Sequence, residues 1–304
     1  MSKVPNTTTV AIPPVPKTPT STTASNVARP QWRSIPITVW ISFVWLGLVI
    51  ALAILQPVLP LPDPAVSDYT AVRTPPFVKA THPLGTDQLG RDLLARVLSG
   101  ASVSLAVGIG STVIAVVLGS LMGAAAGYFG GVWDRVVGWF NDVMLAFPMI
   151  IALIALTTFL GPSLSTIILG MGIVATPLVS RLARSSAMGY AQRDFVAAAK
   201  VGGASSARIL AREILPNIAL VVIPFAITMV ALAITAEGAL SFLGLGVPPP
   251  TPSWGGIMND GRAELRTLPY IVFVPAIVMC VTLLAISFIA DWVNRLSDNR
   301  ESRI

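Results

Sequence analysis

Long stretches without a charged side chain are the feature that most restricts how this chain can fold. Charged residues are absent from residues 34–62, 97–133, 143–180, 214–236, 238–259 and 267–290. About 20 consecutive apolar residues are enough for a helix to cross the hydrocarbon core of a bilayer, so segments of this kind predict membrane-spanning helices. Only 11% of the 304 residues are charged, whereas an ordinary soluble domain contains about a quarter. The sequence therefore predicts an all-α polytopic membrane protein and argues against a soluble globule.

Turn residues divide these segments into six predicted transmembrane helices. The run 143–180 is too long for one helix, and it contains Gly161-Pro162-Ser163, which is typical of a turn. The six spans are expected at residues 37–55, 103–128, 143–160, 164–179, 217–244 and 271–292. In the second span, Gly119, Gly123 and Gly127 recur every four residues and predict a small helix face on which a neighbouring helix packs closely.

The distribution of basic residues predicts the orientation of the spans. Six spans place both termini on one side of the membrane, and 14 of the 20 Lys and Arg residues fall on that side. Six of these 14 lie in the segment 181–215. The positive-inside rule therefore predicts that both termini and this loop are cytoplasmic. The net charge of +6 is therefore explained by the membrane topology. The basic loop lacks the interleaved aromatic residues of a nucleic-acid-binding surface, so we expect membrane lipid and no nucleic acid as a partner.

The two ends of the chain differ from the spans in composition. Residues 1–34 are rich in Pro, Thr and Ser and have no acidic residue, which predicts a disordered cytoplasmic tail. The first span and an extracytoplasmic amphipathic segment are expected over residues 35–100. A transmembrane domain over residues 101–292 would contain the cytoplasmic loop 194–216, and residues 293–304 would form a second cytoplasmic tail.

The sequence contains no recognisable catalytic constellation. His82 is the only histidine and Cys280 the only cysteine, and the motifs of a nucleophile elbow, a P-loop and a zinc protease are all absent. We therefore expect no catalytic residue, no metal site and no cofactor in this chain. Asp142 and Asp291 fall at the predicted membrane surfaces. Only Glu237 lies deep within a span, where pairing with a neighbouring helix is the favoured interpretation.

The cytoplasmic loop has more organisation than a simple connection needs. Asp194 is expected to cap a short helix that begins near Phe195, and Ser205 or Ser206 a second one. Two glycines separate the helices. Such a pair would form a knob with exposed apolar side chains, which is typical of a surface that binds a partner protein.

This loop resembles the "EAA" loop of binding-protein-dependent ABC importer permeases, in which E-A-A-x-x-x-G is followed by I-x-x-x-x-x-L-P. The residues that match are Ala198, Ala199, Gly203, Ile209, Leu215 and Pro216. The chain departs from the pattern at Ala197, where the family usually has Glu, and at Glu213, where the peptide-importer branch commonly has His. The resemblance implies that the matching residues, with Ala204, form a coupling helix that docks in a groove of an ATPase subunit.

The segment 82–92 resembles the H-P-L-G-T-D-x-x-G-R-D signature of oligopeptide, dipeptide and nickel permeases, in the second of their two paired subunits. Its candidate site residues are Gly85, Thr86, Asp87, Gly90, Arg91 and Asp92. Asp87 is expected to cap an amphipathic helix, including Leu89 and Leu98, on the outer membrane surface. We favour the interpretation that Arg91 and Asp92 hold the outer loop in shape and do not contact the substrate.

A third segment, residues 240–255, resembles the L-S-F-L-G-L-G-x-x-P-P-x-x-S-W-G sequence of the same family. Its prolines and Trp254 suggest a rigid docking edge for an extracytoplasmic binding protein.

Together, these resemblances imply a type I ABC importer transmembrane fold in a bacterial plasma (inner) membrane. The chain would be one permease subunit that forms half of a pathway for di- and oligopeptides. Its partners would be a second, homologous permease, two ABC ATPase subunits or domains that bind ATP and Mg²⁺, and a substrate-binding protein. Uptake of nickel or another small solute is an alternative. A secondary transporter or channel is an alternative of a different class, for which Glu237 would be the only support.

Overall fold

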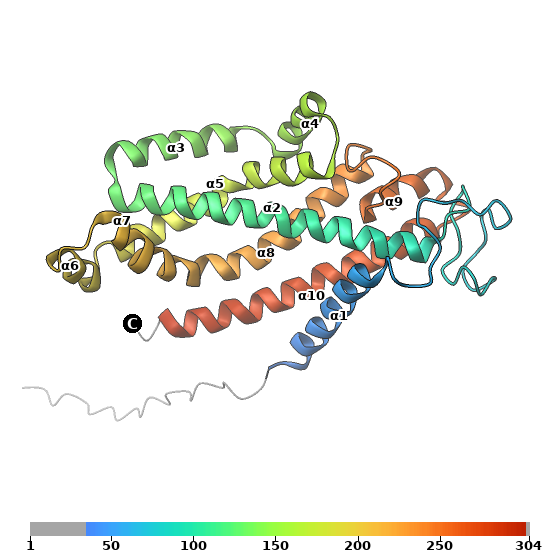
Figure 1. The fold of residues 1–304 in the computed structure, drawn as a ribbon, viewed down its shortest axis with the longest axis horizontal. Helices are drawn as coiled ribbons and strands as arrows, with labels where there is room; N and C mark the ends of the chain where they lie inside the picture. The colour runs from blue at the N-terminus through green and yellow to red at the C-terminus, as the bar shows by residue number, and fades with distance from the viewer. Residues whose placement is uncertain (1–34, 302–304) are drawn as a thin grey trace, which may run out of the picture. The chain divides into compact units, whose positions relative to one another are not determined.

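Ten α-helices, one π-helical segment and one 3-10 segment account for the regular structure of residues 35–301, the part of the chain that the computed structural model describes (Figure 1). The predicted N-terminal tail, residues 1–34, lies outside the described residues. Within the described range there is no named strand, only two isolated bridges, Lys79–His82 and Thr86–Asp92. The prediction of an all-α chain is confirmed.

Five helices are long and apolar enough to cross a membrane. They are α1 (Ile37–Leu55), α2 (Leu93–Phe129), α5 (Leu164–Tyr190), α8 (Leu215–Phe242) and α10 (Tyr270–Glu301). The first has the predicted bounds. At 37 residues, α2 is about 55 Å long at 1.5 Å per residue, whereas the hydrocarbon core is about 30 Å thick. Part of α2 therefore extends beyond the membrane core.

The third predicted span is a bent pair of helices, so the prediction of one helix over residues 143–160 is wrong. The pair consists of α3 (Gly131–Ala146) and α4 (Met149–Leu160), whose axes differ by 88°. Pro148 explains the break, because it lacks a backbone N–H and pushes Phe147 into an extended conformation with φ −93° and ψ 129°. The pair counts as a sixth span only if both helices are taken together.

Polar contacts with α5 explain why α3 begins before the predicted span. Arg184 pairs with Asp134, and Asn141 Nδ2 donates a hydrogen bond to Ser180 Oγ at 3.1 Å. The expectation that Arg184 lies in a loop is wrong, because α5 continues to Tyr190. Arg184, which the sequence placed in a loop, thus connects α5 with α3.

The glycine face of α2 packs against α5, as the four-residue spacing predicted. A Cβ atom on Gly123 would lie 2.2 Å from the carbonyl oxygen of Ser180, and one on Gly127 would lie 2.5 Å from that of Arg184. No side chain larger than hydrogen fits at these distances, so the two helix backbones are in direct contact. Of all the helix pairs in the described part, α2 and α5 share the largest interface.

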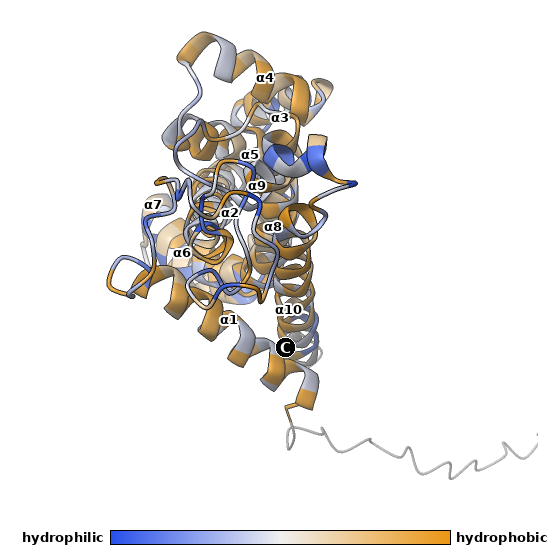
Figure 2. Cartoon of the chain, turned by 90° about the vertical axis from the view of Figure 1, so that its right-hand side faces the viewer, coloured by the Kyte–Doolittle hydropathy of each residue, from blue (hydrophilic) through white to orange (hydrophobic). Residues whose placement is uncertain are grey.

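The long helices separate two ends of different character (Figure 1). At the loop end lie residues 56–92 and α9 (Trp254–Gly261), followed by the 3-10 segment η2 (Arg262–Glu264). At the opposite end, the knob end, lie α6 (Asp194–Val201), α7 (Ser206–Ile209) and the π-helical segment η1 (Leu210–Ile214). Figure 2 views the molecule from the loop end and shows hydrophilic stretches in the loops and short helices there, against long helices that are mostly hydrophobic.

Candidate functional site

Two glycines of the segment 82–92 allow the loop to fold back on its own backbone. A Cβ atom on Gly85 would lie 2.4 Å from the carbonyl oxygen of Thr74, and one on Gly90 would lie 2.3 Å from that of Asp68. Thr86 holds the backbone of Thr74 in this position, because its hydroxyl accepts a hydrogen bond from the N–H of Thr74 at 2.9 Å. The candidate residues of this segment therefore shape the loop itself.

Asp87 forms ion pairs with both Arg91 and Arg96, and its side chain is only 1% exposed. Its Oδ1 accepts hydrogen bonds from the N–H groups of Leu89 (2.8 Å) and Arg91 (3.0 Å). Its Oδ2 accepts from Arg91 Nε at 2.6 Å and from Arg96 Nη1 at 2.9 Å. The Asp87 carboxylate is thus the shared acceptor of four hydrogen bonds, two of them from guanidinium groups.

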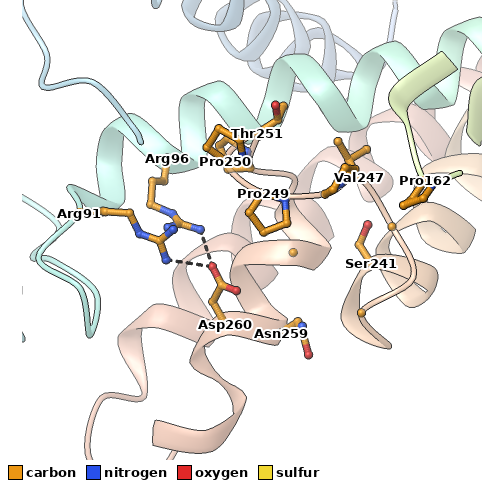
Figure 3. A pocket seen from close by; sticks show the side chains of 15 residues that line it. Arg91, Arg96, Pro162, Ser241, Val247, Pro249, Pro250, Thr251, Asn259 and Asp260 are labelled. Atoms are coloured by element: carbon orange, nitrogen blue, oxygen red, sulfur yellow. Dashed lines mark hydrogen bonds and ion pairs between the residues drawn. The ribbon is translucent and has the colours of Figure 1, made fainter. Parts of the chain in front are cut away.

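The same two guanidinium groups also bind α9. Asp260 Oδ2 accepts from Arg91 Nη2 at 3.1 Å and from Arg96 Nη2 at 2.6 Å (Figure 3). We call Asp87, Arg91, Arg96 and Asp260 the brace. It joins the loop, the start of α2 and α9, and its two positive and two negative charges compensate one another, as a buried ion-pair group requires.

Asp92 is the residue that caps α2. Its Oδ1 accepts from the N–H of Ala95 at 2.7 Å, and its Oδ2 lies 2.8 Å from His82 Nδ1. The expectation that Asp87 caps a separate amphipathic helix is wrong, because the carboxylate of Asp87 instead closes the turn that ends at Arg91. The apolar residues from Leu93 onward are the first turns of α2 itself.

Asp68 lies on the other side of the histidine, with Oδ2 3.4 Å from His82 Nε2. Hydrogen bonds from the hydroxyl and the N–H of Thr70 lower the pKa of the Asp68 carboxyl below its ordinary value, and His82 contributes in the same direction. His82 therefore lies between the carboxylates of Asp68 and Asp92 and connects the loop with the cap of α2.

Trp254 is completely buried, which corrects the expectation that it forms an exposed docking edge. Its indole Nε1 donates to the carbonyl oxygen of Val97 at 3.1 Å, and its backbone N–H donates to Ser104 Oγ at 3.3 Å. Both partners belong to α2. The side chain packs between helices, and the exposed residues of this segment are Leu243, Gly244 and the turn at residues 248–251.

Glu237 of α8 is completely buried and is bonded to two hydroxyl groups. Ser104 Oγ of α2 donates to its Oε2 at 2.9 Å, and Ser241 Oγ donates to its Oε1 at 2.6 Å. Since Ser104 also accepts from Trp254, this carboxyl group connects α8 to α2 and α9. These contacts support a structural role for Glu237 in helix packing.

The cavity in Figure 3 has a volume of about 170 Å³ and opens beside the brace. Arg91 and Arg96 line it together with Ser241 and the turn at residues 248–251. Because both guanidinium groups already bind Asp87 and Asp260, the arrangement suits a mechanical connection better than an open ligand site.

At the knob end, the matched residues Ala198, Ala199 and Gly203, together with Ala204, form the end of α6 and the turn after it. The N–H of Gly203 donates to the carbonyl oxygen of Lys200 at 3.1 Å, and the N–H of Ala204 donates to that of Ala199 at 3.0 Å. These two bonds define a Schellman motif, which requires a left-handed residue after the helix. Gly203 has φ +78°, so the spacing A-x-x-x-G encodes a helix stop.

The helix caps of the knob agree only in part with the sequence. The side chain of Ser205 accepts from the N–H of Arg208, as expected. Asp194 is the first residue of α6 and not its cap, because the preceding Arg193 occupies the cap position without a side-chain bond.

The matched residues Ile209, Leu215 and Pro216 connect the knob to a membrane-spanning helix. Ile209 is 1% exposed and packs with Val196 and Ile214 in one apolar cluster. Leu215 and Pro216 begin α8, and the helical path from Ser206 to Phe242 is continuous. A force on the knob would therefore reach α8 directly.

The outer side of α6 presents apolar side chains to the surroundings. Val201 is 92% exposed and Phe195 is 39% exposed. Apolar side chains that are exposed on a projection of this kind are typical of a protein-binding surface.

Sequence reasoning did not single out Arg96 or Asp260 as site residues. The signal for Arg96 was its position as a lone charge at the start of a long apolar helix. No sequence signal pointed to Asp260, which meets the two arginines only through the fold. Among the described residues, no group of three or more His, Cys, Asp or Glu side chains could hold a metal ion.

Comparison with known proteins places these features in a family. Residues 115–303 match the model of a family described as "Binding-protein-dependent transport system inner membrane component". A putative peptide transport system permease protein of Brucella abortus is 35% identical over 303 residues, which cover 99% of this chain and 98% of the relative. The glutathione transport system permease protein GsiD of Escherichia coli is 36% identical over 224 residues, 74% of this chain and 73% of GsiD.

A solved structure shares the fold. The MetNI methionine ABC transporter, in a structure of its inward-facing conformations, contains a chain that superposes with a TM-score of 0.50 at 17% identity. The superposition covers 67% of this chain and 96% of that one. About two thirds of this chain therefore shares the fold of a chain of that ABC transporter.

Proposed function

The chain belongs to the family of binding-protein-dependent transport system inner membrane components, and from this premise we propose that it forms half of the transmembrane pathway of an ABC importer for di- and oligopeptides. It is a multi-pass protein of the bacterial plasma membrane. The names of the Brucella and Escherichia relatives, a peptide and a glutathione permease, support a peptide substrate over a metal ion.

The proposal assigns a side of the membrane to each end of the molecule. The knob faces the cytoplasm, where it docks on one of two ABC ATPase subunits or domains, and these partners bind ATP and Mg²⁺. The loop end faces the extracytoplasmic binding protein. A second, homologous permease supplies the other half of the pathway.

The observation that carries the proposal is the unbroken connection from the knob into α8. Binding by a partner shifts a two-state equilibrium only if the partner contacts one state better than the other. An ATPase that holds the knob differently before and after closure meets this requirement. Because α7, η1 and α8 form one continuous helical path, a movement of the knob would tilt or shift α8 and change access to the pathway.

The two adjacent glycines of the knob allow a direct test. Gly203→Val places a β-branched residue at φ +78°, a conformation that costs an L-residue about 1–2 kcal/mol or more. We expect the variant to insert normally and to hydrolyse ATP, with peptide uptake per ATP about tenfold lower, because the docked shape of the knob becomes a minor state. The measurement is uptake and ATP hydrolysis by the complete complex in vesicles with its binding protein.

Gly202→Ala is the matched control. Gly202 has an ordinary φ of −70°, and an added Cβ atom would lie no closer than 3.4 Å to any neighbour. This variant should couple as the wild type does. Wild-type uptake per ATP in Gly203→Val would contradict the assignment of the knob as the coupling element.

A further inference from the structure

The helical path from the knob into α8 contains one wide turn, the π-helical segment η1. At this turn the N–H of Leu215 donates to the carbonyl oxygen of Leu210, five residues earlier, whereas an α-helix uses the residue four earlier. Turns of this type are rare, and they are found frequently at functional sites. A plain connection between the knob and α8 would not need one.

The spacing of the buried side chains explains the wide turn. Ile209, Ile214, Ile218 and Val222 are each at most 2% exposed and belong to one apolar cluster. The last three are four residues apart, which keeps them on one face of an α-helix. Ile209 lies five residues before Ile214, and five residues of α-helix turn about 500°, which would place Ile209 about 140° away from Ile214. In the wide turn five residues complete about one turn, so Ile209 stays in the cluster.

Two residues after the turn are suited to it. Pro216 has no N–H to donate to the carbonyl oxygen of Arg212, and in a regular α-helix its ring would press against that group. Asn217 Nδ2 donates to the carbonyl oxygen of Glu213 at 2.5 Å, so a side chain adds a bond to the main chain of the turn. Proline alone does not widen a helix, since Pro224 lies inside the α-helical part of α8. The turn therefore follows from the apolar spacing, and Pro216 and Asn217 stabilise it.

From these observations we propose that the wide turn sets the direction in which the knob faces about the axis of α8, and that Asn217 is a positioning residue for coupling. The inference rests on the proposed function, because the ATPase is the partner that the knob must face. One residue more or fewer in an α-helix changes the rotation by about 100°. Val196 of α6 is completely buried in the same cluster as Ile209, whereas Val201 at the end of α6 is 92% exposed. A rotation of that size would remove Val196 from the cluster and turn Val201 away from its partner.

Changing the length of the turn by one residue in each direction tests the proposal. Deletion of Ala211, an exposed residue of the turn, brings Ile209 within four residues of Ile214. An ordinary α-helix then holds both side chains in the cluster, and the knob keeps its direction. Insertion of one alanine after Ala211 instead places Leu210 five residues before Ile214. Leu210 can take the position of Ile209, so the chain still buries an apolar side chain, but the knob is rotated by about 100°.

The first readout is coupling. Each variant is assembled with the second permease, the ATPases and the binding protein in vesicles, and uptake of Ala-Ala-Ala is measured per ATP hydrolysed. The deletion variant should keep at least about half of the wild-type ratio, and the insertion variant should fall about tenfold, as expected when the docked direction becomes a minor state. If the turn had no special role, both changes would rotate the knob by the same angle and lower the ratio equally.

The second readout needs neither an ATPase nor a peptide. Cys280 is the only cysteine, so Cys280→Ser provides a background in which Ile209→Cys is the single thiol. Its labelling by a maleimide in the purified permease should be slow in the chain of natural length and in the deletion variant, and about tenfold faster in the insertion variant. Arg208→Cys, at an exposed position, should be labelled rapidly in all three.

The two readouts separate the inference from the proposed function. If the wild-type complex does not couple peptide uptake to ATP hydrolysis, the proposed function fails, and the thiol still reports whether the turn sets the direction of the knob. If the complex couples but the deletion variant resembles the insertion variant in either readout, the function stands and the inference is overturned. Should the Ala211 deletion not assemble, deletion of Arg212, also exposed and in the turn, gives the same spacing. Failure of both deletions beside an assembled insertion variant overturns the inference as well.

The role of Asn217 is tested in two backgrounds. Asn217→Ala removes the bond to the carbonyl oxygen of Glu213 and should lower uptake per ATP about threefold in the chain of natural length. In the Ala211 deletion variant no wide turn remains, so the same substitution should have no further effect. An equal loss in both backgrounds would show that Asn217 only stabilises α8 and does not position the knob.

Discussion

The loop end and the knob end are held together by different kinds of contact. At the loop end, the central contacts are ion pairs between buried charged side chains, and Asp87 in the brace accepts four hydrogen bonds. At the knob end, aliphatic side chains pack around Ile209, and a helix stop at Gly203 shapes the turn between α6 and α7. Buried ion pairs resist separation strongly, because each charge would lose its partner in a medium of low dielectric constant. Apolar contacts can rearrange at lower cost.

This contrast suggests a division of labour within one subunit. An element that transmits the movement of a partner needs a low barrier to displacement, and such elements come from the less stable parts of a fold. The helices it moves need a fixed reference. Under the proposed function, the brace and the buried Trp254 keep α2 and α9 together at the loop end while the knob moves α8 from the other end.

Removing the central charge of the brace should have the largest effect on stability. Asp87→Asn leaves Arg91 and Arg96 with one counter-charge, that of Asp260, although Arg96 is 3% exposed. Breaking a buried ion pair from one side costs about 3–5 kcal/mol, so we expect a loss of about 3 kcal/mol. The measurement is the free energy of unfolding of the purified permease in detergent.

Asp63→Asn is the control for this change. Asp63 lies in the same loop and is exposed, and its carboxylate accepts from the N–H of Ala65 at 2.8 Å. Its substitution should change the stability by less than about 0.5 kcal/mol. Equal effects of the two substitutions would mean that the brace does not hold the loop end together.

A smaller effect is expected from a methyl group inserted between α9 and α8. A Cβ atom on Gly255 would lie 2.4 Å from the carbonyl oxygen of Gly238, so Gly255→Ala forces the two helices apart and should cost about 1–3 kcal/mol. The adjacent Gly256 is the control, because a Cβ atom there would lie 3.4 Å from Ser253 Oγ. Gly256→Ala should be neutral or slightly stabilising, since alanine favours a helix more than glycine does. Two equal shifts in thermal unfolding would show that α9 is not tightly packed.

The sequence predicted the features that depend on local composition or spacing. The long apolar runs predicted the five spans that are single helices, and the glycine spacing predicted the contact of α2 with α5. Ser205 was predicted correctly as a helix cap of the knob. Each of these depends on residues close together in the chain, where a periodic or compositional signal is strong.

The features it missed depend on contacts between distant residues or on the effect of one proline. Pro148 stands in a run of apolar residues that satisfies the composition of a span, so the run hides the 88° bend. Asp260 is more than 150 positions from the arginines that it binds, and its carboxylate resembles an ordinary loop residue in the sequence. Trp254 looked exposed because prolines precede it, whereas its indole N–H finds a buried carbonyl group in α2.

The smallest change in stability, with a distinct change in binding, is expected at the tip of the knob. Val201 is 92% exposed, so Val201→Ser should alter the free energy of unfolding by less than about 0.5 kcal/mol. If the tip docks on an ATPase, the same substitution removes an apolar contact from the interface and should weaken retention of the ATPase about fivefold in a titration of the detergent-solubilised complex. Val58→Ser, at an 83% exposed position of the loop end, should change neither quantity. A stable Val201→Ser variant that retains the ATPase as the wild type does would show that the exposed side of α6 is not the docking surface, and the contrast between a fixed end and a coupled end would then rest on Gly203 alone.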